Sequence, residues 1–399
     1  MDEDVNVPQS CILFATADWD EPYWTNKQHS AMSLAELGVS VLYVESVGLR
    51  SPKTGSSRDW KRLWNRLRKG LRSSLGGAVE RAPGIYVLSP LVIPAGHRNP
   101  VFKWLNRYLL RWTINRSTIG WGSNTPLIWT YHPFMLDAID INCAGALLYH
   151  CVDDLAAVPG VDAQEFREAE TLLLKAADVV FVTAPALEER CSQLNSNTHY
   201  LPNVADVTHF GRALDDGPLP PELEAIPEPR LVYHGVLSDF KIDFSLLHDC
   251  ARLRPEWQWV LIGEQREGQR SPLLEQLLAL PNVHFLGYRP YERLPDYLRG
   301  MQVGLLPTLV NDYTRSMFPM KFYEYLAAGL PVVSTPLDFT RNPLPGLAIG
   351  RDPTEFIRAI QNQLGQGKLD SIAARTAVGT NTWHGRMESM MKLLPRKCA

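Results

Sequence analysis

The sequence predicts an α/β protein built from two doubly wound domains that face a central cleft. Short runs of β-branched and aromatic residues recur along the 399 residues, and helical patterns alternate with them. The length exceeds that of one ordinary domain. The stretch over residues 215–230 holds five prolines and no apolar periodicity, which is typical of a linker between two domains.

The predicted N-terminal domain spans residues 1–210 and begins with a strand–helix–strand unit. A strand over residues 11–17 leads through an aromatic and acidic loop to a helix over 27–36 and a strand over 39–45. We expect this connection to be parallel and right-handed. Further along the domain, the pattern predicts strands over 127–130, 146–151 and 179–183 and helices over 162–177 and 185–194.

A basic stretch interrupts this domain over about residues 50–116. It holds fifteen Lys and Arg residues against two acids, although the whole chain has a net charge of −3. Its segments 58–75 and 101–112 place tryptophan and leucine on one helical side and basic residues on the other. Such helices bind membrane interfaces, where each basic residue adds roughly 1 kcal/mol on anionic lipid. The alternative is that the apolar sides pack on the protein core.

The partner and the compartment follow from composition. Because no nucleic-acid-binding module accompanies the basic stretch, we expect an anionic membrane surface and no nucleic acid as its partner. The six cysteines are scattered, and the acidic start MDEDVNVPQS does not resemble a signal peptide. No apolar run approaches the roughly 18 residues that span a bilayer. We therefore expect a cytoplasmic protein, peripheral on the inner face of the cell membrane.

The predicted C-terminal domain covers residues 230–380 and follows a Pro-rich linker over 211–229. Glycines end its first two strands, at Gly235 and Gly263. A helix within residues 381–399 is expected to pack back on the N-terminal domain. The pattern predicts strands over 231–234, 257–262, 283–286 and 303–307 and helices over 244–253, 273–280 and 294–298.

The stretch over residues 314–337 combines a polar loop, a short helix over 320–328 and a β-branched strand. Lys321 and Glu324 lie three positions apart, so they share one helix face. Backbone N–H groups at a helix start favour anions. The combination fits a nucleoside diphosphate, with its phosphates at the helix start and its sugar hydroxyls on Glu324. The alternative is an ordinary unit with a surface ion pair.

Polar residues also follow two strands of the N-terminal domain. His132 comes after the strand over 127–130, so it contacts a sugar or moves a proton, unless it is a structural histidine. Asp153 and Asp154 follow the strand over 146–151, where one can hold a sugar hydroxyl and the other can cap the loop. Asp18 and Asp20 form an Asp-x-Asp pattern that is typical of metal sites but common by chance.

These residues carry a resemblance to the GT-B glycosyltransferases, and within them to the bacterial cell-surface-polysaccharide enzymes of the glycosyltransferase 4 type. The most specific passage is LPNVHFLGYRPYERLPDYLRGMQVGLLP with PMKFYEYLAAGLPVVSTP. Three others are TNKQHSAMSLAELGVSVLYVES, LLYHCVDDLAAVPG through YLPNVADVTHF, and LVYHGVLSDFKIDFSLL with WQWVLIGE. Together they cover most of the chain outside the basic stretch.

The resemblance implies two Rossmann-like domains, of which the C-terminal one binds an NDP-sugar as co-substrate. It matches Glu324 to a carboxylate that holds the ribose and Lys241 to a phosphate-contacting lysine, with Lys321 as a second cation. It implies no metal and no other cofactor. The expected donor site comprises Gly235, Lys241, Gly263, Tyr288, Arg289, Met317, Phe318, Pro319, Lys321 and Glu324, and the expected catalytic residues are His132, Asp153, Lys241 and Lys321.

The chain departs from the family pattern in three places. Ser316 stands where the family has the first of two glutamates, and Val236 stands where it has an arginine. The glycine-rich loop after the first strand is replaced by DWDEPYWTNKQH. These differences leave the donor sugar open.

The predicted function is transfer of a sugar from an NDP-sugar to a lipid-linked or polysaccharide acceptor in cell-surface polysaccharide biosynthesis. The resemblance favours a retaining, metal-independent reaction. One alternative is an NDP-sugar epimerase on the same fold. Another is a non-catalytic homologue that only binds the nucleotide sugar.

Overall fold

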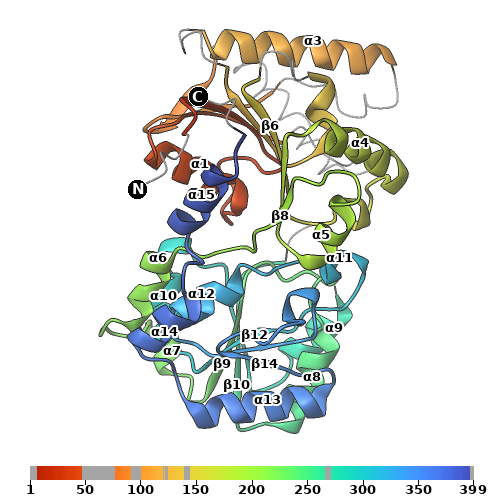
Figure 1. Cartoon of the computed structure of the whole chain (residues 1–399). Coiled ribbons are helices and arrows are strands. Elements are labelled where there is room, and N and C mark those ends of the chain that lie inside the picture. The colour runs from red at the N-terminus through yellow and green to blue at the C-terminus, as the bar shows by residue number, and fades with distance from the viewer. Residues whose placement is uncertain are drawn as a thin grey trace. The chain divides into compact units, whose positions relative to one another are not determined.

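The computed structural model describes residues 7–46, 77–90, 100–119, 121, 125–138, 144–265 and 271–395. The predicted basic helix over residues 58–75 lies outside this part of the chain. The chain divides into two compact units: Met1–Leu201 with Arg386–Ala399 is unit 1, and Pro202–Gly385 is unit 2. Each unit has a central sheet with helices around it (Figure 1).

Unit 1 is built on a sheet whose described strands follow the order β3-β4-β2-β1-β5-β6-β7-β8. Neighbouring strands are parallel except β3 and β4, which form an antiparallel edge pair. Buried runs of apolar residues explain the strands at the centre of the sheet. The strands are β1 (Ser10–Phe14), β2 (Ser40–Val44), β3 (Val79–Ala82), β4 (Ile85–Leu88), β5 (Leu127–Thr130), β6 (Ala146–Cys151), β7 (Val179–Val182) and β8 (Thr198–Tyr200).

Helices cover both faces of this sheet. Side chains of β1 alternate between two cores, with Leu13 on one face and Ile12 on the other. Helix α1 (Asn26–Glu36) and the C-terminal part of α15 (Trp383–Lys392) contribute to the core that holds Leu13. Met387, for example, is fully buried there. The opposite core receives α3 (Pro100–Ser117), α4 (Ala163–Ala176) and α5 (Pro185–Cys191).

The second predicted basic segment, 101–112, is part of α3. The helix rests on unit 1 through Leu110 and Ile114, whereas Trp104 and Tyr108 are exposed. The apolar side that the sequence indicates is therefore not the side that packs on the core. No helix in the described part of the chain is both long and apolar enough to cross a membrane.

Unit 2 contains a parallel sheet whose described strands follow the order β11-β10-β9-β12-β13-β14. On β9, Val232 points into one core and Leu231 into the other. The strands are β9 (Arg230–His234), β10 (Gln258–Ile262), β11 (Val283–Gly287), β12 (Val303–Leu306), β13 (Val332–Ser334) and β14 (Leu347–Ile349). One face carries α6 (Val207–Gly211), α7 (Pro221–Glu224), α10 (Leu294–Arg299), α12 (Lys321–Ala327) and α14 (Ser371–Val378), and the other carries α8 (Phe244–Leu253), α9 (Pro272–Leu278) and α13 (Pro353–Gln366).

The structure corrects the predicted linker and domain boundaries. Residues 211–229 belong to unit 2, which begins at Pro202, and they are not a separate connection. Pro221 starts the short helix α7, and Leu223 and Ile226 are buried in the unit 2 core. Proline is tolerated at the first helical position because that residue needs no N–H partner there. The prolines therefore shape a packed segment.

Candidate functional site

Two glycines bring the carboxyl ends of β9 and β10 close together. The N–H of Gly235, just after β9, donates to the carbonyl of Ile262 at 2.8 Å, and the N–H of Gly263 donates to that of Gly287 at 2.9 Å. Gly263 has a φ of +147°, and a Cβ placed on it would lie 1.8 Å from the carbonyl oxygen of Gly235. Only glycine fits this position.

The start of α12 lies against this sheet edge. A Cβ on Gly235 would lie 2.6 Å from Cε and 2.9 Å from Nζ of Lys321, so the lysine side chain runs directly past the Gly235 backbone. The ammonium is 5.5 Å from the ring centroid of Tyr233, a cation–π distance. Gly329, with a φ of +76°, ends the helix and lets the chain enter β13. The local sequence thereby fixes Lys321 beside the end of β9.

Glu324 lies one turn further along α12 and contacts the last residue of β9. Its Oε2 is 3.3 Å from Nε2 of His234, and both side chains are buried. Burial raises the pKa of Glu324 to about 7, with the Lys321 charge opposing the shift and Asp206 adding to it. Burial, reinforced by Lys321, holds the pKa of His234 well below its usual value. The alternative of a surface Lys–Glu pair is therefore wrong for Glu324, which is 9% exposed.

Aromatic residues from α6 and from the short 3-10 helix Tyr291–Arg293 pack around this cluster. Asp206 caps α6 by accepting from the N–H of His209, and the His209 ring stacks on Tyr291 at 4.1 Å between centroids. Phe210 stacks on the His234 ring at 6.2 Å. The sequence reasoning missed His234, Asp206 and Tyr291. His234 had a usable signal, because it is the last residue of a strand and precedes a glycine.

Lys241 belongs to a neighbouring loop. Its ammonium lies 5.1 Å from the ring centroid of Phe240 and 5.2 Å from that of Tyr313. Its carbonyl accepts from the N–H of Leu309 at 2.9 Å, and Asn311 donates its side-chain amide to the Phe240 carbonyl at 2.8 Å. The segment after β12 therefore holds Lys241 in place.

Tyr288 and Arg289, which the resemblance implies as lining a base, follow β11. Tyr288 is partly exposed. Arg289 donates Nε to the hydroxyl of Tyr297 at 2.6 Å and pairs with Glu222 of α7 at 3.0 Å. Through these bonds to Tyr297 and Glu222, the Arg289 guanidinium connects the end of β11 to α7 and α10.

The loop over residues 317–319 enters the core of unit 2. Phe318 is buried and stacks on Tyr323 at 5.7 Å, and its carbonyl accepts from the Asn203 side-chain amide at 2.5 Å. Met317 packs on the same core, and Pro319 is buried. Phe318 therefore supports the start of α12 from within, whereas the resemblance implies a residue that covers a ligand.

In unit 1, His132 and Asp153 follow β5 and β6, which are parallel neighbours, so both belong to the same edge of the sheet. His132 is buried, and Thr130 donates its hydroxyl to the His132 carbonyl at 2.8 Å. The carbonyl of Asp153 accepts from the N–H of Leu155 at 3.0 Å. Asp154, its neighbour, starts the short 3-10 helix that follows and binds Arg167 at 2.5 Å.

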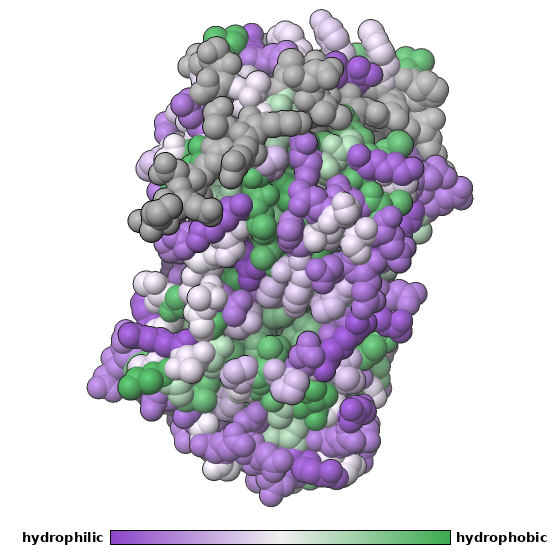
Figure 2. Space-filling view, viewed as in Figure 1, coloured by the Kyte–Doolittle hydropathy of each residue, from purple (hydrophilic) through white to green (hydrophobic). Residues whose placement is uncertain are grey.

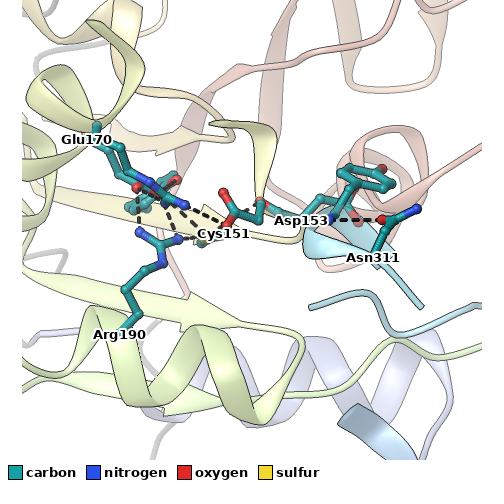
Figure 3. A network of polar contacts seen from close by, with 9 residues as sticks. Cys151, Asp153, Glu170, Arg190 and Asn311 are labelled. Atoms are coloured by element: carbon teal, nitrogen blue, oxygen red, sulfur yellow. Dashed lines mark hydrogen bonds and ion pairs between the residues drawn. The ribbon is translucent and has the colours of Figure 1, made fainter. Parts of the chain in front are cut away.

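A buried charge network supports this edge (Figure 3). Glu170 of α4 accepts from the hydroxyl of Tyr149 at 2.8 Å and from Arg167 and Arg190 at 3.0 and 3.2 Å. Figure 3 shows Glu170 and Arg190 pointing toward one another beside Cys151. Burial opposes ionisation of Glu170, but hydrogen bonds from Arg190 and Tyr149 hold its pKa below the usual range. Asp154 belongs to this network, so its role is structural.

The N-terminal loop that carries the Asp-x-Asp pattern is held by backbone hydrogen bonds and by an ion pair of Asp20. The N–H of Trp19 donates to Glu45 at 2.9 Å, and the Asp18 carbonyl accepts from Gln28 at 3.0 Å. Asp20 pairs with Arg81 at 3.5 Å on the surface.

Comparison with known families matches a stretch within unit 2. Residues 228–366 match the family model described as glycosyl transferases group 1. TuaH of Bacillus subtilis (strain 168), which carries the name of a teichuronic acid biosynthesis glycosyltransferase, is 30% identical over 159 residues. That match covers 38% of this chain and 40% of TuaH, so the likeness extends over two fifths of the relative's length.

Solved structures match over nearly the whole chain. Sucrose-phosphate synthase from Thermosynechococcus elongatus is 19% identical with a TM-score of 0.62, and the match covers 96% of this chain and 94% of that one. An alpha,alpha-trehalose-phosphate synthase (UDP-forming) from Burkholderia vietnamiensis is 12% identical with a TM-score of 0.66, covering 98% of both chains. HepE from Anabaena, in complex with UDP and glucose, is 15% identical with a TM-score of 0.60, covering 96% and 98%. These likenesses confirm the predicted fold, the GT-B arrangement of two Rossmann-like α/β domains.

Proposed function

We propose that this chain, whose residues 228–366 form a glycosyl transferases group 1 domain, transfers a sugar from an NDP-sugar to an acceptor. The observation that carries the proposal is the cluster at the carboxyl end of β9, where Lys321 passes the Gly235 backbone and Glu324 contacts His234. A nucleoside diphosphate presents negative charge next to sugar hydroxyls. A lysine and a carboxylate one helical turn apart can bind these two parts of the ligand, the lysine the phosphates and the carboxylate the hydroxyls.

The donor in this proposal is a uridine diphosphate sugar, or another NDP-sugar of the same design. Two structurally similar proteins support uridine as the first choice, since HepE was solved with UDP and glucose and the trehalose-phosphate synthase is named as UDP-forming. Glu324 would accept hydrogen bonds from the ribose hydroxyls. Gly235 and Gly263 would let the diphosphate approach the backbone, and Tyr288 would border the base.

The proposed chemistry depends on stabilising the departing diphosphate. Fixed cations in a partly desolvated site do this without reorganisation when charge develops. Lys321 and Lys241 are our candidates, and they make the reaction metal-independent. In a retaining reaction, the sugar–phosphate bond breaks as the acceptor oxygen attacks from the same face, and a phosphate oxygen takes the acceptor proton.

Unit 1 would supply the acceptor side. His132 and Asp153 share one edge of its sheet, where loops beyond strand ends bind ligands in folds of this kind. We propose that His132 contacts the reacting sugar and that Asp153 holds an acceptor hydroxyl. Similarity to TuaH supports a lipid-linked or saccharide acceptor in cell-surface polysaccharide biosynthesis. The basic stretch over residues 50–116 supports peripheral attachment at the inner face of the cell membrane.

The test is release of NDP from a panel of NDP-sugars, with and without a membrane extract as the source of acceptor. The proposal predicts release that depends on one sugar nucleotide and on the extract. Transfer of labelled sugar to the organic or polymer fraction should equal the NDP released.

Other outcomes separate the alternatives. Interconversion of the sugar or release of NDP without any acceptor would indicate an epimerase or a hydrolase. If no NDP-sugar binds and none is consumed, the enzyme proposal is wrong. Tight binding without turnover in any extract would indicate a non-catalytic nucleotide-sugar-binding protein.

A further inference from the structure

Helix α3 carries a stripe of large apolar side chains that face away from unit 1. Val101, Trp104, Tyr108 and Trp112 are 67, 64, 59 and 42% exposed. They recur every three or four residues, so they share one face of the helix. The rings of Trp104 and Tyr108 stack at 6.1 Å and 15°. Single exposed apolar residues are ordinary, but a contiguous row of this size indicates an interaction surface.

The opposite face of α3 already holds the helix in place. Leu110 and Ile114 are buried in the unit 1 core, and Thr113 is also buried. Among the described residues, the unit 1 core includes Leu110 and Ile114 of α3, and it does not include Trp104 or Trp112. The described part of unit 1 leaves the stripe exposed, and we look for its partner outside the protein.

The charges beside the stripe restrict what that partner can be. The sequence of α3, PVFKWLNRYLLRWTINRS, contains no acidic residue. On a helical projection, Arg107 and Arg111 border the stripe on one side and Arg116 on the other. The Arg116 guanidinium lies 5.7 Å from the Trp112 ring. Figure 2 shows pale and hydrophilic side chains projecting together where Figure 1 places α3.

The geometry points to α3 as a docking helix that lies flat on an anionic lipid bilayer. The stripe enters the boundary between headgroups and acyl chains, and the arginines contact lipid phosphates. Tryptophan and tyrosine favour this depth because their rings are apolar with one polar edge. The row from Trp104 to Trp112 runs roughly 12 Å along the helix axis. This inference rests on the peripheral attachment proposed above and assigns it to a face of the protein.

An anionic lipid surface fits better than a protein partner. A bilayer satisfies aromatic rings and arginines at once through its acyl boundary and its phosphates. Pairing two copies through this face would bring arginines from both chains together with no acidic residue of α3 to offset them. A second copy is therefore an outcome to test.

The experiment compares the full-length protein with two variants in a vesicle sedimentation assay. The stripe variant combines Trp104→Ser, Tyr108→Ser and Trp112→Ser. The control variant combines Leu172→Ser, Leu253→Ser and Ile372→Ser, which removes three exposed apolar side chains (62, 61 and 78%) from other helices. Vesicles contain either phosphatidylcholine alone or a mixture with phosphatidylglycerol. NDP-sugar binding in solution is measured on the same samples.

We expect the wild type and the control variant to bind the anionic vesicles with an affinity that falls as salt rises. The stripe variant should bind at least about tenfold more weakly, with NDP-sugar binding unchanged. Equal vesicle binding by the stripe variant and the wild type would overturn the inference. The inference would also be overturned if the wild type bound neither kind of vesicle. It would likewise be overturned if the stripe variant lost self-association in sedimentation velocity but kept its vesicle binding. If no sample, the wild type included, binds an NDP-sugar, the result counts against the proposed function instead.

Discussion

The imidazole Nε2 of His234 lies 3.3 Å from the carboxylate Oε2 of Glu324. His234 is the last residue of β9, and Glu324 belongs to the first turn of α12. Both side chains are buried. Burial favours the neutral form of each: it holds the pKa of His234 well below its usual value and raises the pKa of Glu324 to about 7. A group that changes charge near pH 7 within the proposed donor site would make donor binding depend on pH.

Donor binding should weaken as the pH falls below about 7. The pKa of Glu324 is raised to about 7, chiefly by burial, so acidification converts it from a hydrogen-bond acceptor into a neutral acid. The affinity for an NDP-sugar should fall about tenfold per pH unit below that value, as for uptake of one proton. Titration calorimetry at several pH values measures this. An NDP-sugar is a suitable ligand because its phosphates are esterified and do not titrate in this range.

Glu324→Gln provides the control, because glutamine has the same shape and no titration. This variant should bind the NDP-sugar more weakly at pH 8 and show a nearly flat profile. Asp206, Lys321 and Tyr291 also interact electrostatically with Glu324. A profile that keeps its full slope in the variant would show that Glu324 is not the group that titrates.

The same substitution should stabilise unit 2 at alkaline pH. The folded-state pKa of Glu324 lies above its usual value of 4.5, so its contribution to stability is complete below about pH 4.5 and is lost as the pH rises through 7. The shift corresponds to at most about 3 kcal/mol. Relative to the wild type, Glu324→Gln should gain stability between pH 5 and pH 8, as measured by hydrogen exchange of β9 and α12. A gain that is equal at both pH values would contradict the burial argument.

Gly235→Ala should impair donor binding more than stability. The new Cβ would meet Cε and Nζ of Lys321 at 2.6 and 2.9 Å, so the lysine must move away from the backbone. Gly367→Ala is the matched control, with a φ of +79° and nothing within 4 Å of its Cβ. Both variants carry backbone strain of about 1–3 kcal/mol and should lose a few degrees of thermal stability. Only Gly235→Ala should also lose NDP-sugar affinity, by about tenfold or more.

Glu170→Gln tests the buried network of unit 1. The change removes the charge that Arg167 and Arg190 share, and these arginines are only partly exposed. We expect a loss of about 2–3 kcal/mol, below the range for fully buried pairs because water reaches the guanidinium groups. Glu168→Gln on the same helix is exposed and should change stability by less than about 0.5 kcal/mol. Urea unfolding monitored in unit 1 makes the comparison, and equal losses would show that the network adds nothing.

Much of the fold could be predicted because it depends on local pattern. Buried parallel strands read as β-branched runs, and the three-residue spacing of Lys321 and Glu324 does place both against β9. The contact of Glu324 with His234 could not be predicted, since it joins residues far apart in the sequence. It depends on which strand α12 packs against. The site therefore looked like a pair on one helix, whereas the structure adds a strand-end histidine.

One error arose where composition was ambiguous. The prolines over residues 211–229 are typical of a linker, yet Leu223 and Ile226 are buried in unit 2. A helix of four residues is too short to show periodicity. In α3 both faces carry apolar residues. The tryptophan side, which the sequence predicts for an interface and not for the core, is exposed at Trp104, whereas Leu110 packs inward.

The most direct test of the proposed donor site is NDP-sugar binding by Lys321→Met, measured by titration calorimetry beside the wild type. Methionine keeps much of the side-chain volume and removes the charge that burial disfavours, so unit 2 should stay folded. Lys368→Met is the control, because burial also lowers the pKa of Lys368 while its ammonium contacts the Arg299 carbonyl. The account predicts at least about a hundredfold loss of affinity for Lys321→Met and none for Lys368→Met. Unchanged affinity in Lys321→Met would contradict a donor site at the start of α12.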